Sequence, residues 1–327
     1  MKRRTFLQLG GMAVAACATG ISSISHAQSS PANSAQASNA ATFRAMRRYA
    51  DLPLGRIAYV ERGSGAVALF LHGAPLNGFQ WRGAIDRLSP LRRCIAPDFM
   101  GLGYTQVPAG TALAAGAQVT MLVALLDALG VAKVDLVASD SGGAVAQLFV
   151  AHHPKRVRTL LLTNCDVEPD SPPPGVKPAI EMARAGTLAE ATEKWLGDTN
   201  LARSTFGAAV YHDPAKFAAE TIAYYVEPLV SSSLRRAQYH AFHIALEPNP
   251  LAGIEAALKR SNVPVKIVWG SSDTVFSKDD AQYLDRTFPR SQGIRWVPEG
   301  KLFFPEEYPD VIAEEARALW HSTSAIT

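Results

Sequence analysis

The stretch Asp135-Leu136-Val137-Ala138-Ser139-Asp140-Ser141-Gly142-Gly143-Ala144-Val145-Ala146 decides the fold. An apolar run leads into a tight turn of small residues, and a second apolar run with helical spacing follows. The pattern predicts a buried strand over 134–138, a sharp turn, and a helix over 144–151. A turn of this kind, from strand directly to helix, exposes the side chain at its apex, and that residue is Asp140.

A carboxyl group at this apex indicates one class of covalent chemistry. A carboxylate nucleophile forms an alkyl ester with its substrate, as in dehalogenation or epoxide opening, whereas a serine performs acyl transfer. Ser141 is an alternative nucleophile, because small residues flank it as well. A further interpretation is that Asp140 only caps the following helix, a role that is compatible with catalysis.

The rest of the chain alternates strands and helices on either side of one long helical insertion. Strands separated by helices of this length predict a mostly parallel sheet with right-handed crossovers. A proline-rich stretch begins the segment 169–250, which shows helical patterns at 187–196, 214–225 and 233–246 and no strand pattern. We interpret this segment as a helical cap. The remaining strands are predicted over 56–61, 67–71, 93–96, 160–163, 263–269 and 293–297, and the remaining helices over 120–129 and 309–320.

The predicted domain organisation is one α/β core interrupted by the cap and preceded by a processed leader. The predicted parts are a signal peptide (1–27), a flexible linker (28–42), a first core part (43–168), the cap (169–250) and a second core part (251–327).

The leader resembles a twin-arginine export signal. Lys2-Arg3-Arg4-Thr5-Phe6-Leu7 is followed by an apolar run to Ile21, and Ser25-His26-Ala27 offers a small-x-small cleavage site. The run is too short and too glycine-rich for a stable membrane span. We therefore expect the Tat export machinery to carry the folded protein to the periplasm or outside the cell. A lipid anchor at Cys17 is an alternative, because Val14-Ala15-Ala16-Cys17 resembles a lipobox.

The composition favours a small-molecule substrate over nucleic acid as the partner of this protein. Charged residues are 19% of the chain and the formal net charge is +3, which does not favour nucleic-acid binding. The sequence contains neither metal-ligand spacing nor a phosphate-binding loop, so we expect no metal and no cofactor. Cys94 and Cys165 lie in predicted strand regions, and no disulfide framework is expected.

Further motifs accompany the turn, in the order that one superfamily requires. His72-Gly73-Ala74-Pro75 directly follows an apolar strand, and Ala96-Pro97-Asp98-Phe99-Met100-Gly101-Leu102-Gly103-Tyr104-Thr105 supplies a glycine-rich loop. Beyond the turn, a buried strand leads to an acid, Asp273. Together with Asp140, these motifs resemble the α/β-hydrolase superfamily, and most closely its haloalkane dehalogenase and epoxide hydrolase branch. The resemblance covers about residues 49–165 and 251–320.

The resemblance implies an α/β-hydrolase fold, with a mostly parallel central sheet, flanking helices and an inserted helical cap. It implies that Asp140 is the nucleophile, because the Gly142-Gly143 pair stands two and three places after the nucleophile in this family. In the same scheme Asp273 is the acid that orients a histidine. The turn after His72 supplies a backbone N–H to the oxyanion or halide site. The residues expected around this site are Gly73, Ala74, Trp81 and Ser141.

The histidine of this triad is missing. In the family a Gly-His pair follows the last strand, and an aromatic residue and an acid come a few positions later. Aligning Phe303 and Glu306 with that pattern places Leu302 at the histidine position. General-base assistance is typically worth about 10²–10⁴-fold, so we expect another group to assist the breakdown of an ester intermediate. The alternative bases are His240, His243, Glu306 and Glu307.

Two positions disfavour a dehalogenase. Dehalogenases of this branch place a tryptophan after the nucleophile, where its indole N–H binds halide, and here Ser141 stands there. The Asn or Glu often found after the His-Gly pair is Ala74. An epoxide-hydrolase-like enzyme is therefore favoured, in which cap tyrosines protonate the epoxide oxygen, although such aromatic residues also fit helix packing. The cap candidates are Tyr211, Tyr224, Tyr225, Tyr239 and His243.

The sequence thus predicts an exported hydrolase that uses an aspartate nucleophile and an atypical triad. Its substrate is expected to be a small organic molecule: an epoxide, a haloalkane or a reactive ester. The alternatives are a ligand-binding homologue without turnover, a Ser141-dependent esterase, and a cofactor-free lyase or carbon–carbon hydrolase. The fold does not choose among them, because function resides in the site.

Overall fold

The computed structural model describes residues 38–324. The predicted signal peptide, Cys17 and residues 28–37 of the predicted linker lie outside this range. Residues 40–42, which the sequence assigns to the end of the linker, instead begin helix α1 (Ala40–Ala45). The side chain of Asn39 accepts a hydrogen bond from the Thr42 amide and so caps this helix, which explains why it begins there.

The core of the protein is an eight-stranded sheet in the order β1-β2-β4-β3-β5-β6-β7-β8. The pairs β1/β2 and β2/β4 are antiparallel, and every other pair is parallel, which confirms the predicted mostly parallel sheet. The strands are β1 (Arg47–Leu52), β2 (Gly55–Arg62), β3 (Val67–Leu71), β4 (Arg93–Pro97), β5 (Val134–Asp140), β6 (Val157–Cys165), β7 (Val265–Gly270) and β8 (Ser291–Val297).

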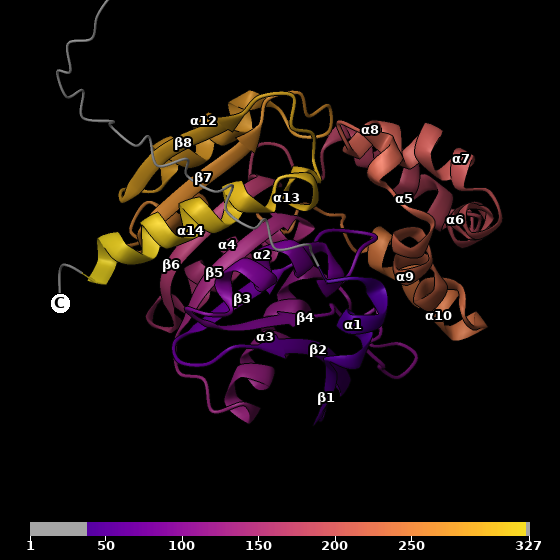
Figure 1. Cartoon of the computed structure of the whole chain (residues 1–327), viewed down its shortest axis with the longest axis horizontal. Helices are drawn as coiled ribbons and strands as arrows, with labels where there is room; N and C mark the ends of the chain where they lie inside the picture. Colours follow the sequence, from indigo (N-terminus) through magenta and orange to yellow (C-terminus); the bar gives the residue numbers. More distant parts are fainter. Residues whose placement is uncertain (1–37, 325–327) are drawn as a thin grey trace, which may run out of the picture. The chain divides into compact units, whose positions relative to one another are not determined.

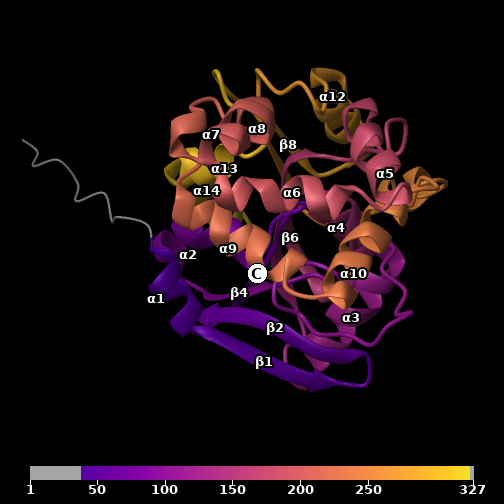
Figure 2. The same cartoon turned by 90° about the vertical axis from the view of Figure 1, so that its right-hand side faces the viewer.

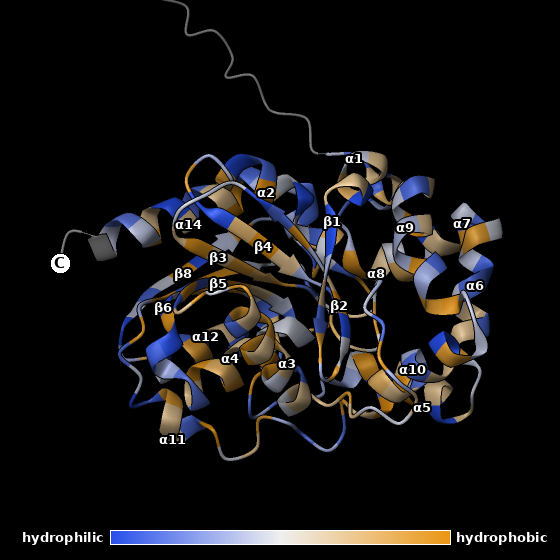
Figure 3. Ribbon diagram, turned by 90° about the horizontal axis from the view of Figure 1, so that it is seen from below, coloured by the Kyte–Doolittle hydropathy of each residue, from blue (hydrophilic) through white to orange (hydrophobic). Residues whose placement is uncertain are grey.

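Helices cover both faces of this sheet, which is why its central strands are apolar along their length. Figure 3 shows α2 (Arg82–Leu88) and α14 (Pro309–Ser324) on one side of the sheet. On the other side lie α3 (Ala115–Ala128), α4 (Ser141–His152) and α12 (Lys278–Thr287). Every residue of β3 and β5 is buried as a result. Shorter helical segments are η1 (Gly78–Trp81), η2 (Pro154–Arg156), α11 (Glu255–Leu258) and α13 (Phe304–Glu307).

The segment predicted as a cap is helical and contains no strand between residues 169 and 250. Its longest helices, α9 and α10, pack against each other, and α6 packs against α9. Figure 2 views the molecule from the side of this cap, with α6, α9 and α10 in front of the sheet, and Figure 1 shows the cap beside the core. The cap elements are η3 (Pro174–Val176), α5 (Lys177–Arg184), α6 (Leu188–Gly197), α7 (Thr199–Ala202), η4 (Arg203–Gly207), α8 (Ala208–Val210), η5 (Pro214–Lys216), α9 (Ala219–Val230) and α10 (Ser233–Ile244).

The glycine pair at the start of α4 lets this helix pack directly on the sheet. A Cβ atom on Gly142 would lie 2.5 Å from the carbonyl oxygen of His72. A Cβ atom on Gly143 would lie 2.3 Å from the Cβ of Cys165 on β6. Any larger residue would push α4 away from the strands, so the close approach that forms the turn at Asp140 depends on these two glycines.

Candidate active site

Asp140 ends β5 and stands directly before α4, in a strained backbone conformation with φ 56° and ψ −135°. A non-glycine residue holds such a conformation only where its surroundings enforce it, and functional sites are where this occurs most often. The side chain is buried, and its Oδ2 accepts a hydrogen bond of 2.9 Å from the Ala74 amide. The structure therefore places Ala74, which was predicted to lie around the site, next to Asp140 at the apex of the turn.

The ionisation of Asp140 reflects two opposing influences. Burial and the nearby Asp166 carboxylate raise the pKa of Asp140 well above its usual range. The backbone amides of Ala74 and Ser141 donate to the carboxylate and lower the same pKa. These two amides are also suitably placed to stabilise negative charge on an oxygen of this carboxyl group during a reaction.

Gly73 is needed because Asp140 lies against its backbone. A Cβ atom on Gly73 would lie 2.4 Å from Oδ2 of Asp140. The adjacent His72 fixes the loop, since its Nδ1 donates to the Gly73 carbonyl and its Nε2 accepts from the Phe99 amide. Both ring nitrogens of His72 are thus used by the backbone, and burial lowers its pKa.

The predicted triad acid, Asp273, lies on a loop next to the one that leads to Leu302, the residue predicted at the histidine position. Asp273 follows β7 and accepts hydrogen bonds from the Asn164 side chain at 2.7 Å and the Val275 amide at 2.9 Å. Burial raises the pKa of Asp273 to about 6. The Ser272 amide donates to the Gly300 carbonyl at 2.9 Å, which holds the loop before Leu302 beside this acid. Among residues 38–324, no histidine hydrogen-bonds to Asp273.

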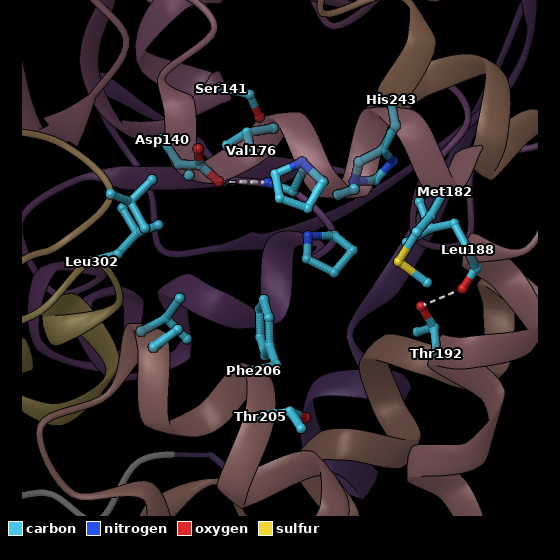
Figure 4. Close-up of a pocket in the computed structure, with 18 of the residues that line it drawn as sticks. Asp140, Ser141, Val176, Met182, Leu188, Thr192, Thr205, Phe206, His243 and Leu302 are labelled. Atoms are coloured by element: carbon cyan, nitrogen blue, oxygen red, sulfur yellow. Dashed lines mark hydrogen bonds between the residues drawn. The ribbon is translucent and has the colours of Figure 1, made fainter. Parts of the chain in front are cut away.

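A cavity of about 640 Å³ lies between the cap and the carboxyl ends of the strands. Figure 4 shows Asp140, Ser141 and Leu302 on one side of this cavity and His243, Met182 and Leu188 on the other. Most of its lining is apolar, as expected of a pocket for a small organic molecule. The polar side chains in its wall are Asp140, Ser141, Asp166, Thr192, Lys194, Thr205, Tyr239 and His243.

The structure corrects the expected role of three cap tyrosines as proton donors. The hydroxyls of Tyr211 and Tyr225 donate to Glu306 at 2.8 and 2.9 Å, and Glu306 also pairs with the Arg82 guanidinium. Tyr224 accepts a hydrogen bond from Arg47. None of the three tyrosines lines the cavity, because each is part of the packing between cap and core.

Tyr239 does line the cavity, but its proton is already engaged. Thr192 donates its hydroxyl proton to the Leu188 carbonyl at 2.9 Å. The contact of 3.2 Å between Thr192 and Tyr239 therefore requires Tyr239 to be the donor.

The alternative bases have structural partners as well. The buried His243 lines the cavity, donates from Nδ1 to the Tyr239 carbonyl, and has its pKa lowered to about 4 by burial. His240 accepts from the Ala189 amide, and Glu307 accepts from two backbone amides of the cap. Trp81, expected near the site, is instead buried in the core against Phe70, outside the cavity wall.

Asp166 is a site residue that the sequence analysis missed. It follows β6 directly, is buried, and lines the cavity together with Asp140. The Ser171 hydroxyl donates to its Oδ1 at 2.7 Å, and burial raises its pKa to about 6. The available signal was its position after an apolar strand, because the carboxyl ends of neighbouring parallel strands meet at one edge of the sheet.

Within residues 38–324, no group of three or more His, Cys, Asp or Glu side chains is arranged to hold a metal ion. In this same part of the chain, no helix is both long enough and apolar enough to cross a membrane.

Comparison with known proteins agrees with this architecture. Residues 67–308 match the family model described as the alpha/beta hydrolase fold. Haloalkane dehalogenase 2 of Mycobacterium tuberculosis is 26% identical over 291 residues, covering 81% of this chain and 92% of that protein. The cis-3-alkyl-4-alkyloxetan-2-one decarboxylase of Shewanella oneidensis is 29% identical over 274 residues, covering 79% and 83%. The solved structure of epoxide hydrolase CorEH is 25% identical, with a TM-score of 0.70, and the match covers 84% of this chain and 98% of that one.

The chain therefore belongs to the α/β-hydrolase fold family. Within that family it is a hydrolase of the branch that resembles haloalkane dehalogenases and epoxide hydrolases.

Proposed function

We propose that this enzyme opens a strained oxygen ring or displaces a halide with the Asp140 carboxylate, and that epoxides are its favoured substrates. The observation that carries the proposal is the buried Asp140 carboxylate in the wall of an apolar cavity, with Oδ2 held by the Ala74 amide. In either reaction the ring oxygen or the halide is displaced from the substrate carbon, which is left joined to this carboxylate as an ester that water then hydrolyses.

An epoxide fits the site better than a haloalkane does. Ser141 and Ala74 supply no side-chain N–H for a halide, and Trp81 lies in the core. The acids Asp140, Asp166 and Asp273 give the region negative character, which disfavours a departing anion. An epoxide oxygen stays bonded to the substrate, so no free anion has to be held.

A strained lactone is a second candidate substrate. The Shewanella protein to which the chain is similar is named for a dialkyl oxetan-2-one, a four-membered ring with two apolar substituents. The apolar cavity suits such a molecule as well as it suits an alkyl epoxide.

The structure favours Asp140 over Ser141 as the nucleophile. A catalytic serine requires a base within hydrogen-bond reach. The buried Ser141 hydroxyl has no hydrogen-bond partner among the described residues. Ser141 is also the first residue of α4, whereas the strained apex of the turn is Asp140.

Asp140→Asn is expected to abolish covalent capture of substrate, because a neutral amide cannot displace the leaving group. The purified mature protein is incubated with styrene oxide, 1-bromohexane or a 3,4-dialkyl oxetan-2-one, and intact-mass spectra are recorded over time. In ¹⁸O-labelled water, a single turnover of the wild-type protein places ¹⁸O in the peptide that contains Asp140. Ser141→Ala is the matched control and is expected to retain both signals. Product formed by Asp140→Asn at the wild-type rate would exclude Asp140 as the nucleophile.

We also propose that the twin-arginine machinery exports the folded enzyme to the periplasm or outside the cell. The order of basic, apolar and small-x-small segments in residues 2–27 supports export. Replacing Arg3 and Arg4 with lysine is expected to leave unprocessed protein in the cytoplasm, measured by cell fractionation and intact mass. Undiminished processed protein outside the cytoplasm would contradict this route, and a mature chain beginning at a lipidated Cys17 would identify a lipid anchor.

A further inference from the structure

We propose that Asp166 performs the task of the missing histidine: it activates the water that hydrolyses the Asp140 ester, and it protonates the ring oxygen when an epoxide opens. This inference rests on the proposed function, because it requires an ester on Asp140.

The sheet places Asp166 beside Asp140. Cys165 of β6 lies opposite Asp140 of β5 in the register, and Asp166 is the next residue. Both carboxyl groups are buried and line the same cavity. The Ser171 hydroxyl holds the Asp166 carboxylate, and the Gln147 amide donates to the Asp166 carbonyl at 2.7 Å. Asp166 is therefore a fixed carboxyl group at the reacting end of the pocket.

A second, smaller cavity beside Asp166 has room for a water molecule next to the large one. Its volume is about 20 Å³, which is enough for one water molecule. The polar residues that line it are Gln118, Ser141, Asp166 and Ser171, and Asp166 and Ser141 also line the large cavity. A water held there has Asp166 as a proton acceptor.

The two carboxyl groups are coupled by their charges. Two buried carboxylates repel each other, so over a range of pH the pair retains one proton. Esterification of Asp140 removes its negative charge and leaves Asp166 as the ionised partner, which makes Asp166 a base at the stage that requires one. The other titratable groups that act on the pair or line its cavities are Cys165, Asp170, Lys194, Tyr239, His243, Asp273 and Asp280.

The proton and bond balance closes over one cycle. The reacting form of the pair has Asp140 ionised and its one proton on Asp166. An oxygen of the Asp140 carboxylate attacks an epoxide carbon, the carbon–oxygen bond of the ring breaks, and the ring oxygen takes the proton from Asp166. Asp166 then takes a proton from water while the hydroxide adds to Cγ of Asp140. The ester bond breaks, the departing alkoxide takes the proton back from Asp166, and a diol leaves. Asp140 is released as the acid, and the pair again holds one proton.

Among the described residues that line the cavity, no other side chain fits both tasks. The Tyr239 proton is donated to Thr192, and Leu302 carries no titratable group. His243 is a weaker base than Asp166, since the two pKa values are about 4 and about 6. The Lys194 ammonium group is largely exposed to solvent.

Asp166→Asn is expected to trap the ester. With 1-bromohexane, whose displacement needs no proton donor, Asp140 is still alkylated, but the adduct decays about 10²-fold more slowly than in the wild-type protein, the lower end of general-base effects. With styrene oxide, adduct formation also slows. Intact-mass spectra after removal of excess reagent measure the decay. Asp127→Asn, an exchange of the same type at an exposed position of α3, is the matched control and is expected to decay at the wild-type rate.

The pH profile separates this role from a structural one. The attacking Asp140 must be ionised, so alkylation by 1-bromohexane rises with pH as Asp140 loses its proton. Asp166 raises the pKa of Asp140, so Asp166→Asn is expected to move the midpoint of this rise to lower pH. Ser171→Ala removes a hydrogen bond that lowers the pKa of Asp166. It is therefore expected to move the rise of ester decay to higher pH, and it provides a second test if Asp166→Asn does not fold.

The outcomes distinguish the two proposals. Absence of an Asp140 adduct and of turnover in wild-type and Asp166→Asn proteins would overturn the proposed function. An adduct that decays equally fast in both proteins, with unchanged pH midpoints, would leave Asp140 as the nucleophile and overturn the role of Asp166. Partial recovery of ester decay in Asp166→Glu, which restores the carboxylate, would support it.

Discussion

Leu302→His is expected to speed the breakdown of the Asp140 ester by about 10²-fold, because it introduces a general base. Leu302 lines the cavity on the side of Asp140, and its loop is held against the residues around Asp273. A histidine there is close to an acid that has no imidazole partner in residues 38–324. The decay rate of the 1-bromohexane adduct is expected to rise with pH around the ordinary histidine pKa of about 6.5.

Two controls test the origin of this gain. Leu302→Gln introduces a polar side chain of similar reach without a base, and it should not accelerate decay. Combining Leu302→His with Asp273→Asn should lose most of the gain, because the imidazole then lacks the acid that orients it. In the Asp166→Asn background, Leu302→His should restore ester decay. Failure to do so in a folded protein would show that position 302 does not reach the ester.

Glu306→Ala is expected to lower the free energy of unfolding by about 3–5 kcal/mol, because it leaves a buried cation without its partner. The side chain of Arg82 is 16% exposed and that of Glu306 is 2% exposed, so water cannot replace the lost charge. The hydroxyls of Tyr211 and Tyr225 lose their acceptor in the same step. Urea unfolding followed by tryptophan fluorescence measures the change.

The matched control for Glu306 is a surface ion pair. Asp310 pairs with Arg87 but is 76% exposed, so Asp310→Ala is expected to cost less than about 1 kcal/mol. Because Glu306 and its tyrosine partners do not line the cavity, folded Glu306→Ala should still form the Asp140 adduct within a few-fold of the wild-type rate. A folded variant that no longer hydrolyses the ester would instead identify Glu306 as the base.

The fold was predictable where hydrophobic pattern and local structure agree. The apolar runs at β3, β5 and β7 are buried and were found. Strand β1 was not, because its side chains are only partly buried and its pairing with β2 holds it in place. Helix α12 was not predicted because it is mostly polar, although the Ser277–Asp280 capping box marks its start in the sequence.

The site was predictable only where a role depends on position along the chain. The turn at Asp140, the acid after β7 and the substitution at Leu302 follow from the order of motifs. The partners of Tyr211 and Tyr225 do not, because Glu306 reaches them only through tertiary packing. The place of Asp166 in the site follows only from the pairing of β6 with β5, because the spacing of residues in the sequence does not determine which strands are neighbours.

The cavity wall is divided between the core, which carries the reacting groups, and the cap, which determines the molecules that fit. Asp140, Asp166 and Leu302 belong to the core, whereas most of the apolar lining comes from residues 172–246 of the cap. Mutations in the cap can therefore alter which molecules enter without disturbing the charged end of the pocket. Natural variants of this protein are thus free to acquire new substrate ranges through the cap alone, and exchanging this segment between relatives is a direct route to redesigning them.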